Sequence, residues 1–91
     1  MLFLVRVRVD VAKLAEFGAK LQAGALDRSA IRGETHCLAD DPAVGYSYWE
    51  AEDRAGFDAI FAAWLPYYDE VEISAVIAPR EAMRRLVDGG H

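Results

Sequence analysis

The sequence has 91 residues and a formal net charge of −5, and 54% of its residues are hydrophobic and 11% aromatic. This composition is typical of one folded domain, expected to span residues 1–91, and it excludes a disordered segment. The negative charge disfavours nucleic acid as a partner, and no stretch approaches the roughly 20 apolar residues that cross a membrane. The single Cys37 cannot close an intrachain disulfide, as is usual in the cytoplasm, where we expect the protein to be located.

The opening residues 1–9 alternate along their whole length, as a half-buried strand does. Side chains on a strand point alternately to its two faces, so the odd-numbered residues from Phe3 to Val9 share one apolar face. The other face is apolar at its start and cationic at its end. It carries Leu2, Leu4, Arg6 and Arg8.

Two amphipathic helices are predicted from apolar residues that recur at helical spacing. The first follows Asp10, which can act as its N-cap, and stops at Gly24. The second follows Asp53, another N-cap candidate, and Pro66 ends it. The strongest helical signal in the chain is the set of apolar residues at i, i+3, i+4 and i+7 in this second helix, namely Phe57, Ile60, Phe61 and Trp64.

Three more strands and a short terminal helix complete the predicted elements. Residues 30–38 fit an edge strand, and the turn residues at 40–42 join it to a strand over residues 44–51 in an antiparallel hairpin. Residues 69–77 alternate cleanly and form the fourth strand. The terminal helix begins at Pro79 and is stopped by Gly89-Gly90, and its apolar stripe consists of Ala82, Met83, Leu86 and Val87.

The order of these elements, strand, helix, strand, strand, helix, strand and tail helix, predicts a ferredoxin-like α+β fold (βαββαβ). In this fold four strands form one antiparallel sheet in the order 4-1-3-2, and both main helices cover the same face. The opening strand is then central, between the third and fourth strands. The other face has no helix, and what covers it bears on what the protein can do.

The face without helices mixes apolar and charged side chains, which is unusual for a sheet face in water. A chain this short with so many apolar residues favours burying part of its surface against a partner. We therefore predict a homodimer that stacks two such faces and encloses a polar pocket, with higher oligomers left open. In the register expected for the first and fourth strands, Leu4 pairs with Val76, Arg6 with Ser74 and Arg8 with Glu72.

Six side chains on this face are candidates for a site. His36 is a candidate general acid or base, a role that histidine often has in catalysis near neutral pH, with Glu72 as the second catalytic candidate. Arg6 and Arg8 are candidates for binding a substrate carboxylate, since a guanidinium fork matches that group. The two remaining ligand-binding candidates, which can line a pocket for a small organic molecule, are Tyr46 and Tyr48.

Each of these candidates has a purely structural alternative. His36 can be an edge-strand residue in solvent, and strand tyrosines are often simple packing residues. The two arginines can form ion pairs with Glu72 or Glu34 in a dimer interface. Residues 67–69, after the second helix, form either the lip of a pocket or a solvent-facing turn. Two histidines and one cysteine give no recognised ligand spacing, so no metal is expected.

Four segments carry a resemblance to a known family: Met1–Arg6, Tyr46-Ser47, Leu65–Tyr68 and Val71–Ile73. Through them the chain resembles the dimeric α+β barrels and, within them, the muconolactone Δ-isomerases. This resemblance covers both ends of the chain and the order of elements, whereas residues 31–41 depart from the pattern. Isomerases of that family move a proton within a lactone without a metal or an organic cofactor, and they associate through their sheets, often into larger rings. The resemblance therefore implies no cofactor here, and it assigns no catalytic residue.

Residues 52–55 are also similar to the start of the second helix in YciI-like proteins, and cofactor-free monooxygenases of the antibiotic-biosynthesis type are further relatives by fold. The leading interpretation is a homodimeric barrel that binds a small anionic organic compound, with isomerase-like proton transfer as its candidate activity. The alternative is a barrel without chemistry that serves assembly or regulatory ligand binding. The sequence does not separate the two.

Overall fold

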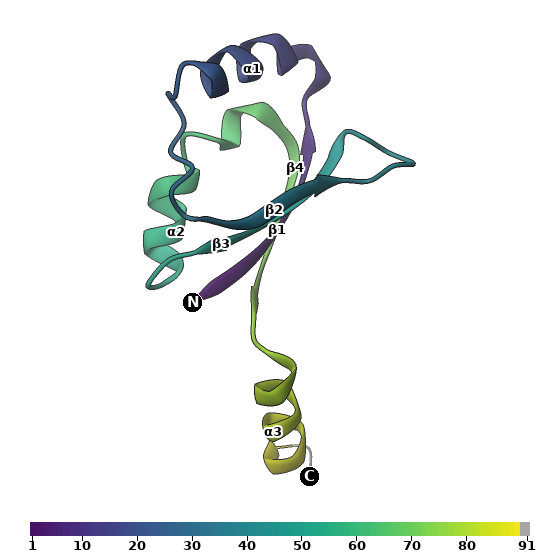
Figure 1. The fold of residues 1–91 in the computed structure, drawn as a ribbon, viewed down its shortest axis with the longest axis vertical. Helices are drawn as coiled ribbons and strands as arrows, with labels where there is room; N and C mark the ends of the chain where they lie inside the picture. The colour runs from purple at the N-terminus through teal and green to yellow at the C-terminus, as the bar shows by residue number, and fades with distance from the viewer. Residues whose placement is uncertain (90–91) are drawn as a thin grey trace.

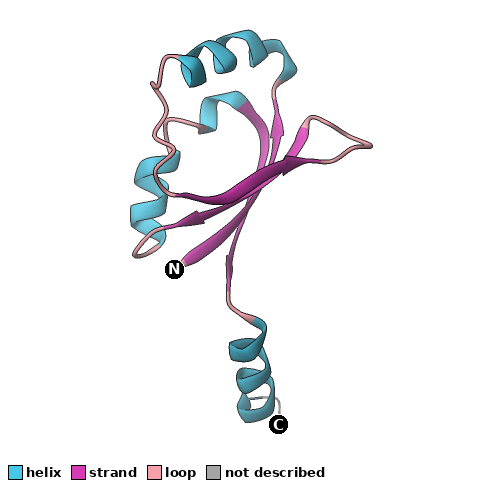
Figure 2. Cartoon of the chain, viewed as in Figure 1, coloured by secondary structure: helices cyan, strands magenta, loops and turns pink. Residues whose placement is uncertain are grey.

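The computed structural model describes residues 1–89, which form one four-stranded antiparallel sheet and three α-helices (Figures 1 and 2). The strand order is β2-β3-β1-β4, so the predicted central position of the first strand is confirmed. The chain has a ferredoxin-like α+β fold, as predicted. Its elements are β1 (Leu2–Val9), η1 (Val11–Lys13), α1 (Leu14–Gln22), β2 (Ile31–Cys37), β3 (Val44–Glu50), α2 (Arg54–Phe61), η2 (Leu65–Tyr67), β4 (Tyr68–Val76) and α3 (Pro79–Gly89), where η marks a 3-10 turn.

Both predicted N-caps are confirmed. The Asp10 carboxylate accepts a hydrogen bond from the backbone N–H of Ala12 at 3.0 Å, and Asp53 accepts one from Gly56 at 2.8 Å. Gly24 follows α1 with a φ of +69°, a left-handed conformation that glycine adopts without a steric penalty. The first helix therefore stops where the sequence predicts, although its first turn is the 3-10 turn η1.

The second helix is shorter than predicted. It ends at Phe61, because the backbone N–H of Trp64 donates to the carbonyl of Phe61 at 2.8 Å and tightens the chain into the i→i−3 pattern that leads into η2. Trp64 lies beyond α2 but is still only 4% exposed. The last helix, α3, extends through Gly89, and the other half of its predicted stop, Gly90, lies outside the described residues.

The core lies between one face of the sheet and the helices (Figure 1). Phe3 and Val5 on β1 are each 1% exposed. The centre of the core is Trp49 on β3, whose Nε1 donates a hydrogen bond to Ser47 Oγ at 2.8 Å. The ring of Trp49 stands nearly perpendicular to three other rings at centroid distances of 5.2–5.8 Å, those of Phe57, Phe61 and Trp64.

The predicted register between β1 and β4 was wrong by two residues. An even shift leaves every side chain on its predicted face, so the division of residues between the two faces is unaffected. The observed register sets both arginines of β1 opposite glutamates and pairs the apolar ends of the two strands, which favours it over the predicted one. The observed pairs are Leu2 with Val76, Leu4 with Ser74, Arg6 with Glu72 and Arg8 with Glu70, in place of Leu4 with Val76, Arg6 with Ser74 and Arg8 with Glu72.

A bulge interrupts the pairing of β1 with β4 near one end of the sheet. The register shifts between Arg8 and Val9, so Val9 pairs with Tyr68, and Asp69 is the extra residue. Strict alternation would have turned Asp69 toward the helices. Because of the bulge, Tyr68 takes that position and packs against the core.

A second irregularity lies in β2, at the edge of the sheet. Arg32 pairs with Tyr48 and His36 pairs with Tyr46, so β2 has two more residues than β3 between these two pairs. Gly33, in this interval, has a φ of +71°, which glycine adopts without a steric penalty. The parity is unchanged. Arg32 and His36 therefore keep the same side of the sheet.

The loop between β2 and β3 is attached to β1 by Arg8. The Arg8 guanidinium donates to both carboxylate oxygens of Asp41, at 2.6 and 3.3 Å, and to Glu70 at 3.3 Å. The hydrogen bond from Arg8 lowers the pKa of Asp41, and the same bond raises the pKa of Arg8. Within one chain, Arg8 thus forms its ion pairs with Asp41 and Glu70. The ion pairs with Glu72 or Glu34 that are expected in a dimer interface stay a prediction.

Replacing Phe57 by alanine should lower the free energy of unfolding by about 3–5 kcal/mol, because a fully buried ring is removed from the core. Urea unfolding followed by tryptophan fluorescence measures this. The matched control is Glu16→Ala, an exposed position on α1, with an expected change within about 0.5 kcal/mol. Equal effects of the two substitutions would contradict the described core.

Replacing Asp41 by asparagine should destabilise the protein at neutral pH. A carboxyl whose pKa is lowered on folding adds stability above its unfolded pKa of 3.8, and this stability is lost as the pH falls through the lower folded value. The difference from the wild type should therefore shrink below about pH 4. Asp40→Asn, at a neighbour that forms no ion pair among residues 1–89, is the control. A difference that does not depend on pH would rule out the ion pair as its cause.

Candidate functional site

The six residues proposed from the sequence all lie on the sheet face that α1 and α2 leave uncovered, called here the open face. Four of them form one row across the sheet, because each is paired with the next on the neighbouring strand. Arg8 and Tyr48 lie beside this row on β1 and β3. In order from β2 to β4, the row consists of His36, Tyr46, Arg6 and Glu72.

The row is long and open. β2 and β4 are the two edges of the sheet, so three interstrand spacings, roughly 14 Å, separate His36 from Glu72. The His36 side chain is 75% exposed and lies 3.7 Å from the Glu34 carboxylate. Within one chain, His36 and Glu72 are too far apart to act together on one small substrate. Arg8 is already occupied by Asp41 and Glu70.

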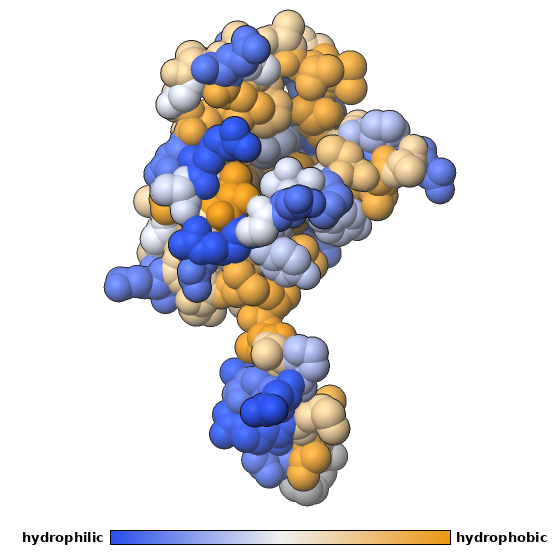
Figure 3. Space-filling view, in the orientation of Figure 1, coloured by the Kyte–Doolittle hydropathy of each residue, from blue (hydrophilic) through white to orange (hydrophobic). Residues whose placement is uncertain are grey.

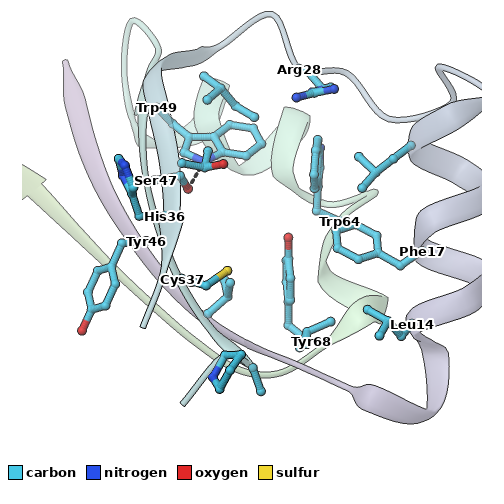
Figure 4. Close-up of a pocket in the computed structure, with 18 residues that line it drawn as sticks. Leu14, Phe17, Arg28, His36, Cys37, Tyr46, Ser47, Trp49, Trp64 and Tyr68 are labelled. Atoms are coloured by element: carbon cyan, nitrogen blue, oxygen red, sulfur yellow. Dashed lines mark hydrogen bonds between the residues drawn. The ribbon is translucent and has the colours of Figure 1, made fainter. Parts of the chain in front are cut away.

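A cavity of about 300 Å³ lies on the opposite face, between the sheet, α1 and the segment that follows α2 (Figure 4). Three apolar side chains of α1 line it: Leu14, Phe17 and Leu21. None of them is fully buried, and Leu14 is 51% exposed. The rest of the apolar wall consists of Val7, Val9, Ile31, Ala43, Trp49 and Trp64. Most of these residues, including the three on α1, are ones that alternation and helical spacing assign to a packed core.

One of the few polar groups directed into this cavity is the hydroxyl of Tyr68 (Figure 4). Tyr68 comes from β4, and the bulge at Asp69 turns it inward. Burial raises the pKa of Tyr68 to about 12, because the phenolate would lose its hydration. At neutral pH the hydroxyl is therefore a hydrogen-bond donor. The sequence identified residues 67–69 as a candidate pocket lip, and Tyr68 does line a pocket.

A second unused donor belongs to Trp64. Its side chain lines the cavity, and its Nε1 is buried without a hydrogen-bond partner among residues 1–89. Trp49 differs, because its own Nε1 donates to Ser47. A buried N–H that lacks a partner costs free energy, so an acceptor that reached it would bind favourably.

Two further groups complete the site. The guanidinium of Arg28, an exposed residue between α1 and β2, lies at the rim of the cavity, and the thiol of Cys37 on β2 points into it (Figure 4). His36 and Tyr46 also border the cavity, but Figure 4 shows their side chains on the other side of the sheet. Arg28 was missed by sequence reasoning because a single arginine in a connector carries no pattern.

Residues 1–89 contain no group of three or more His, Cys, Asp or Glu side chains placed to hold a metal ion. None of their helices is long and apolar enough to cross a membrane. The residues that line the cavity make it an apolar, aromatic site with the Tyr68 hydroxyl inside and a cation at its rim.

No family model matches the chain, and no curated protein matches it. Among solved structures, it is similar to 5-chloro-2-hydroxyhydroquinone dehydrochlorinase (TftG) from Burkholderia phenoliruptrix AC1100 in complex with 2,5-dihydroxybenzoquinone. The identity is 13% and the TM-score 0.52, over 89% of this chain and 98% of that one. It is also similar to a protein from Bordetella bronchiseptica assigned to the antibiotic biosynthesis monooxygenases, with 18% identity and a TM-score of 0.48, over 85% and 96% of the two chains.

At these identities the likeness concerns the fold alone. The match with the dehydrochlorinase extends over nearly the whole of both chains and agrees with the strand order and the position of the helices. The chain therefore shares the fold of this structure, and that fold is the ferredoxin-like α+β fold predicted from the sequence.

Proposed function

We propose that the chain binds a small, flat organic molecule in the cavity between the sheet and α1. The observation that carries this proposal is the apolar face of α1, whose side chains line an open cavity of about 300 Å³ instead of a filled core. That volume is at the lower end of the range for small-molecule sites, which are typically apolar with a few convergent polar groups. The cavity has this composition.

The walls indicate the kind of ligand. Phe17 and Tyr68, which are only partly buried, offer aromatic surfaces suited to a ring. The Tyr68 hydroxyl can donate to a carbonyl or phenolic oxygen, and Arg28 at the rim favours an anion. A one-ring compound with oxygen substituents meets these conditions. The dehydrochlorinase of the same fold was solved with such a molecule, 2,5-dihydroxybenzoquinone, which makes that compound a suitable probe.

A finer proposal is that the chain transfers a proton within a small anionic substrate, as muconolactone isomerases do. The row of His36, Tyr46, Arg6 and Glu72 on the open face supplies an acid–base candidate and a cation for it. Since the ends of the row are far apart, this site needs a second open face stacked on the first, in the proposed homodimer. The alternative is a protein that binds a ligand or assembles without chemistry, and turnover distinguishes the two. The free thiol of Cys37 fits the proposed location in the cytoplasm.

The Tyr68→Phe variant should bind 2,5-dihydroxybenzoquinone about 3- to 10-fold more weakly than the wild type in isothermal titration calorimetry. The substitution removes a neutral hydrogen-bond donor from the cavity and keeps the ring. The matched variant is Tyr48→Phe, which removes a hydroxyl from the open face. Weaker binding in Tyr48→Phe but not in Tyr68→Phe would move the ligand to the open face. No binding to the wild type by any of a panel of oxygenated one-ring compounds would contradict the proposal.

Proton transfer is tested by incubating muconolactone with the protein in D₂O and following deuterium incorporation by NMR. His36→Gln should slow the exchange by about 10²- to 10⁴-fold, the usual contribution of a general acid or base. Lys20→Gln, at an exposed position of α1 outside both the row and the lining of the cavity, is the control. Deuterium exchange that is no faster than in buffer alone would contradict proton transfer and favour a protein that binds a ligand without chemistry. Exchange that depends on Tyr68 and not on His36 would place the chemistry in the cavity.

A further inference from the structure

The last helix, α3, has an apolar stripe that no other part of residues 1–89 covers. Its three largest apolar side chains, Met83, Leu86 and Val87, are 66%, 71% and 65% exposed. The helix stands clear of the sheet and of the other helices (Figure 1), and apolar surface runs along one of its sides (Figure 3). Single exposed apolar residues are common, but three on one face of a short helix form a patch.

A helix of this kind is weak when isolated. α3 has 11 residues, and helices of that length are marginal in water unless an apolar face packs against another element. Its internal support consists of ion pairs from Glu81 to Arg84 and Arg85 on the exposed surface. The stability of α3 therefore depends on a surface that covers its stripe.

The sheet of the same chain is poorly placed to be that surface. Only Ile77 and Ala78 connect β4 to α3, and Ala78 precedes Pro79, which restricts it to an extended conformation. The chain consequently continues away from the sheet, in the general direction of β4 (Figure 1). Folding α3 back onto the open face would require a reversal within these two residues.

The open face has an uncovered apolar end of its own. Leu2 and Val76, which are paired across β1 and β4, and Leu4 beside them are only half-buried. Met1 and Ile77 at the same end are 59% and 45% exposed. Each copy of the chain thus has an uncovered apolar stripe on α3 and an uncovered apolar patch on its sheet. Two copies can each place the stripe on the patch of the other, which gives a closed dimer with two-fold symmetry.

Charge favours the same partner. α3 carries three arginines and two acidic residues, whereas the rest of the chain carries seven basic and thirteen acidic side chains. On the open face, Glu72 forms no ion pair within residues 1–89, and neither does Arg80 at the start of α3. A basic helix and an acidic body attract each other between copies of the same chain.

We propose that α3 is a docking arm for a second copy of this chain, with its Met83, Leu86 and Val87 stripe covering the Leu2, Leu4 and Val76 patch of the partner. This interaction gives the predicted homodimer a defined contact. It does not depend on any ligand in the cavity, which lies on the other face of the sheet.

Sedimentation equilibrium of the full chain tests the arm. The wild type should be a dimer, and the double substitution of Leu86→Asp and Val87→Asp should raise the dimer dissociation constant by at least about 30-fold. The control Asp88→Asn, on the opposite side of the helix, should leave it unchanged. Circular dichroism and the melting transition of the body show that the variant is folded. A monomeric wild type, or a double variant that dimerises as tightly as the wild type, would overturn the proposal.

Crosslinking identifies the partner surface. In a Cys37→Ser background, one preparation carries Leu86→Cys and another Leu4→Cys, and a short bismaleimide is added to their mixture. A covalent product of one chain of each kind is expected, in excess over products of two identical chains. A chain with both substitutions that crosslinks only within itself would show that α3 folds onto its own sheet and would refute the exchange.

Discussion

The packing of Trp49 is the interaction on which the rest of the structure depends. This side chain is 2% exposed, and its edge-on contacts with Phe57, Phe61 and Trp64 attach α2 and the segment after it to the sheet. α1 has no equivalent anchor. Its contact with this cluster is through Phe17, whose ring meets Trp64 at 6.0 Å and stacks on Tyr67 at 5.0 Å. α2 is thus firmly seated, whereas α1 spans a gap, and the cavity is the volume beneath α1.

The sequence was sufficient to predict the fold, because the fold follows from two repeat periods of the apolar residues. Alternation in the strands assigns each side chain to a face, and the 3.6-residue period, together with Asp53 and Gly24, sets helix positions. The register of β4 was not predictable in the same way, since alternative cross-strand pairings differ by only about 0.2–1 kcal/mol each. Two such registers, two residues apart, satisfy the same alternation. The end of α2 at Phe61 likewise depends on a local backbone hydrogen bond and not on a residue type.

The cavity was beyond sequence reasoning for a different reason. Leu14, Phe17 and Leu21 have the pattern of core residues whether the helix that carries them rests on the sheet or stands a few ångströms away. The candidate residues found from the sequence were polar and lie on the open face. They were recognisable there because they share a strand face with apolar residues such as Leu2 and Leu4. Polar groups in the cavity are fewer, and Tyr68 was recognisable only as part of a segment that follows a helix. The functional role of the row from His36 to Glu72 stays a prediction.

The bulge at Asp69 has a consequence for how the specificity of this site could change. Strict alternation would have directed a carboxylate into the cavity at this point, and a buried carboxylate repels anions and selects cationic or donor-bearing ligands. The extra residue substitutes a neutral phenol for it without changing any amino acid. In this fold, then, a single-residue insertion or deletion in an edge strand can invert the charge preference of the site. Relatives that differ in length at this strand are therefore expected to differ in the polarity of their ligands, even where their side chains agree.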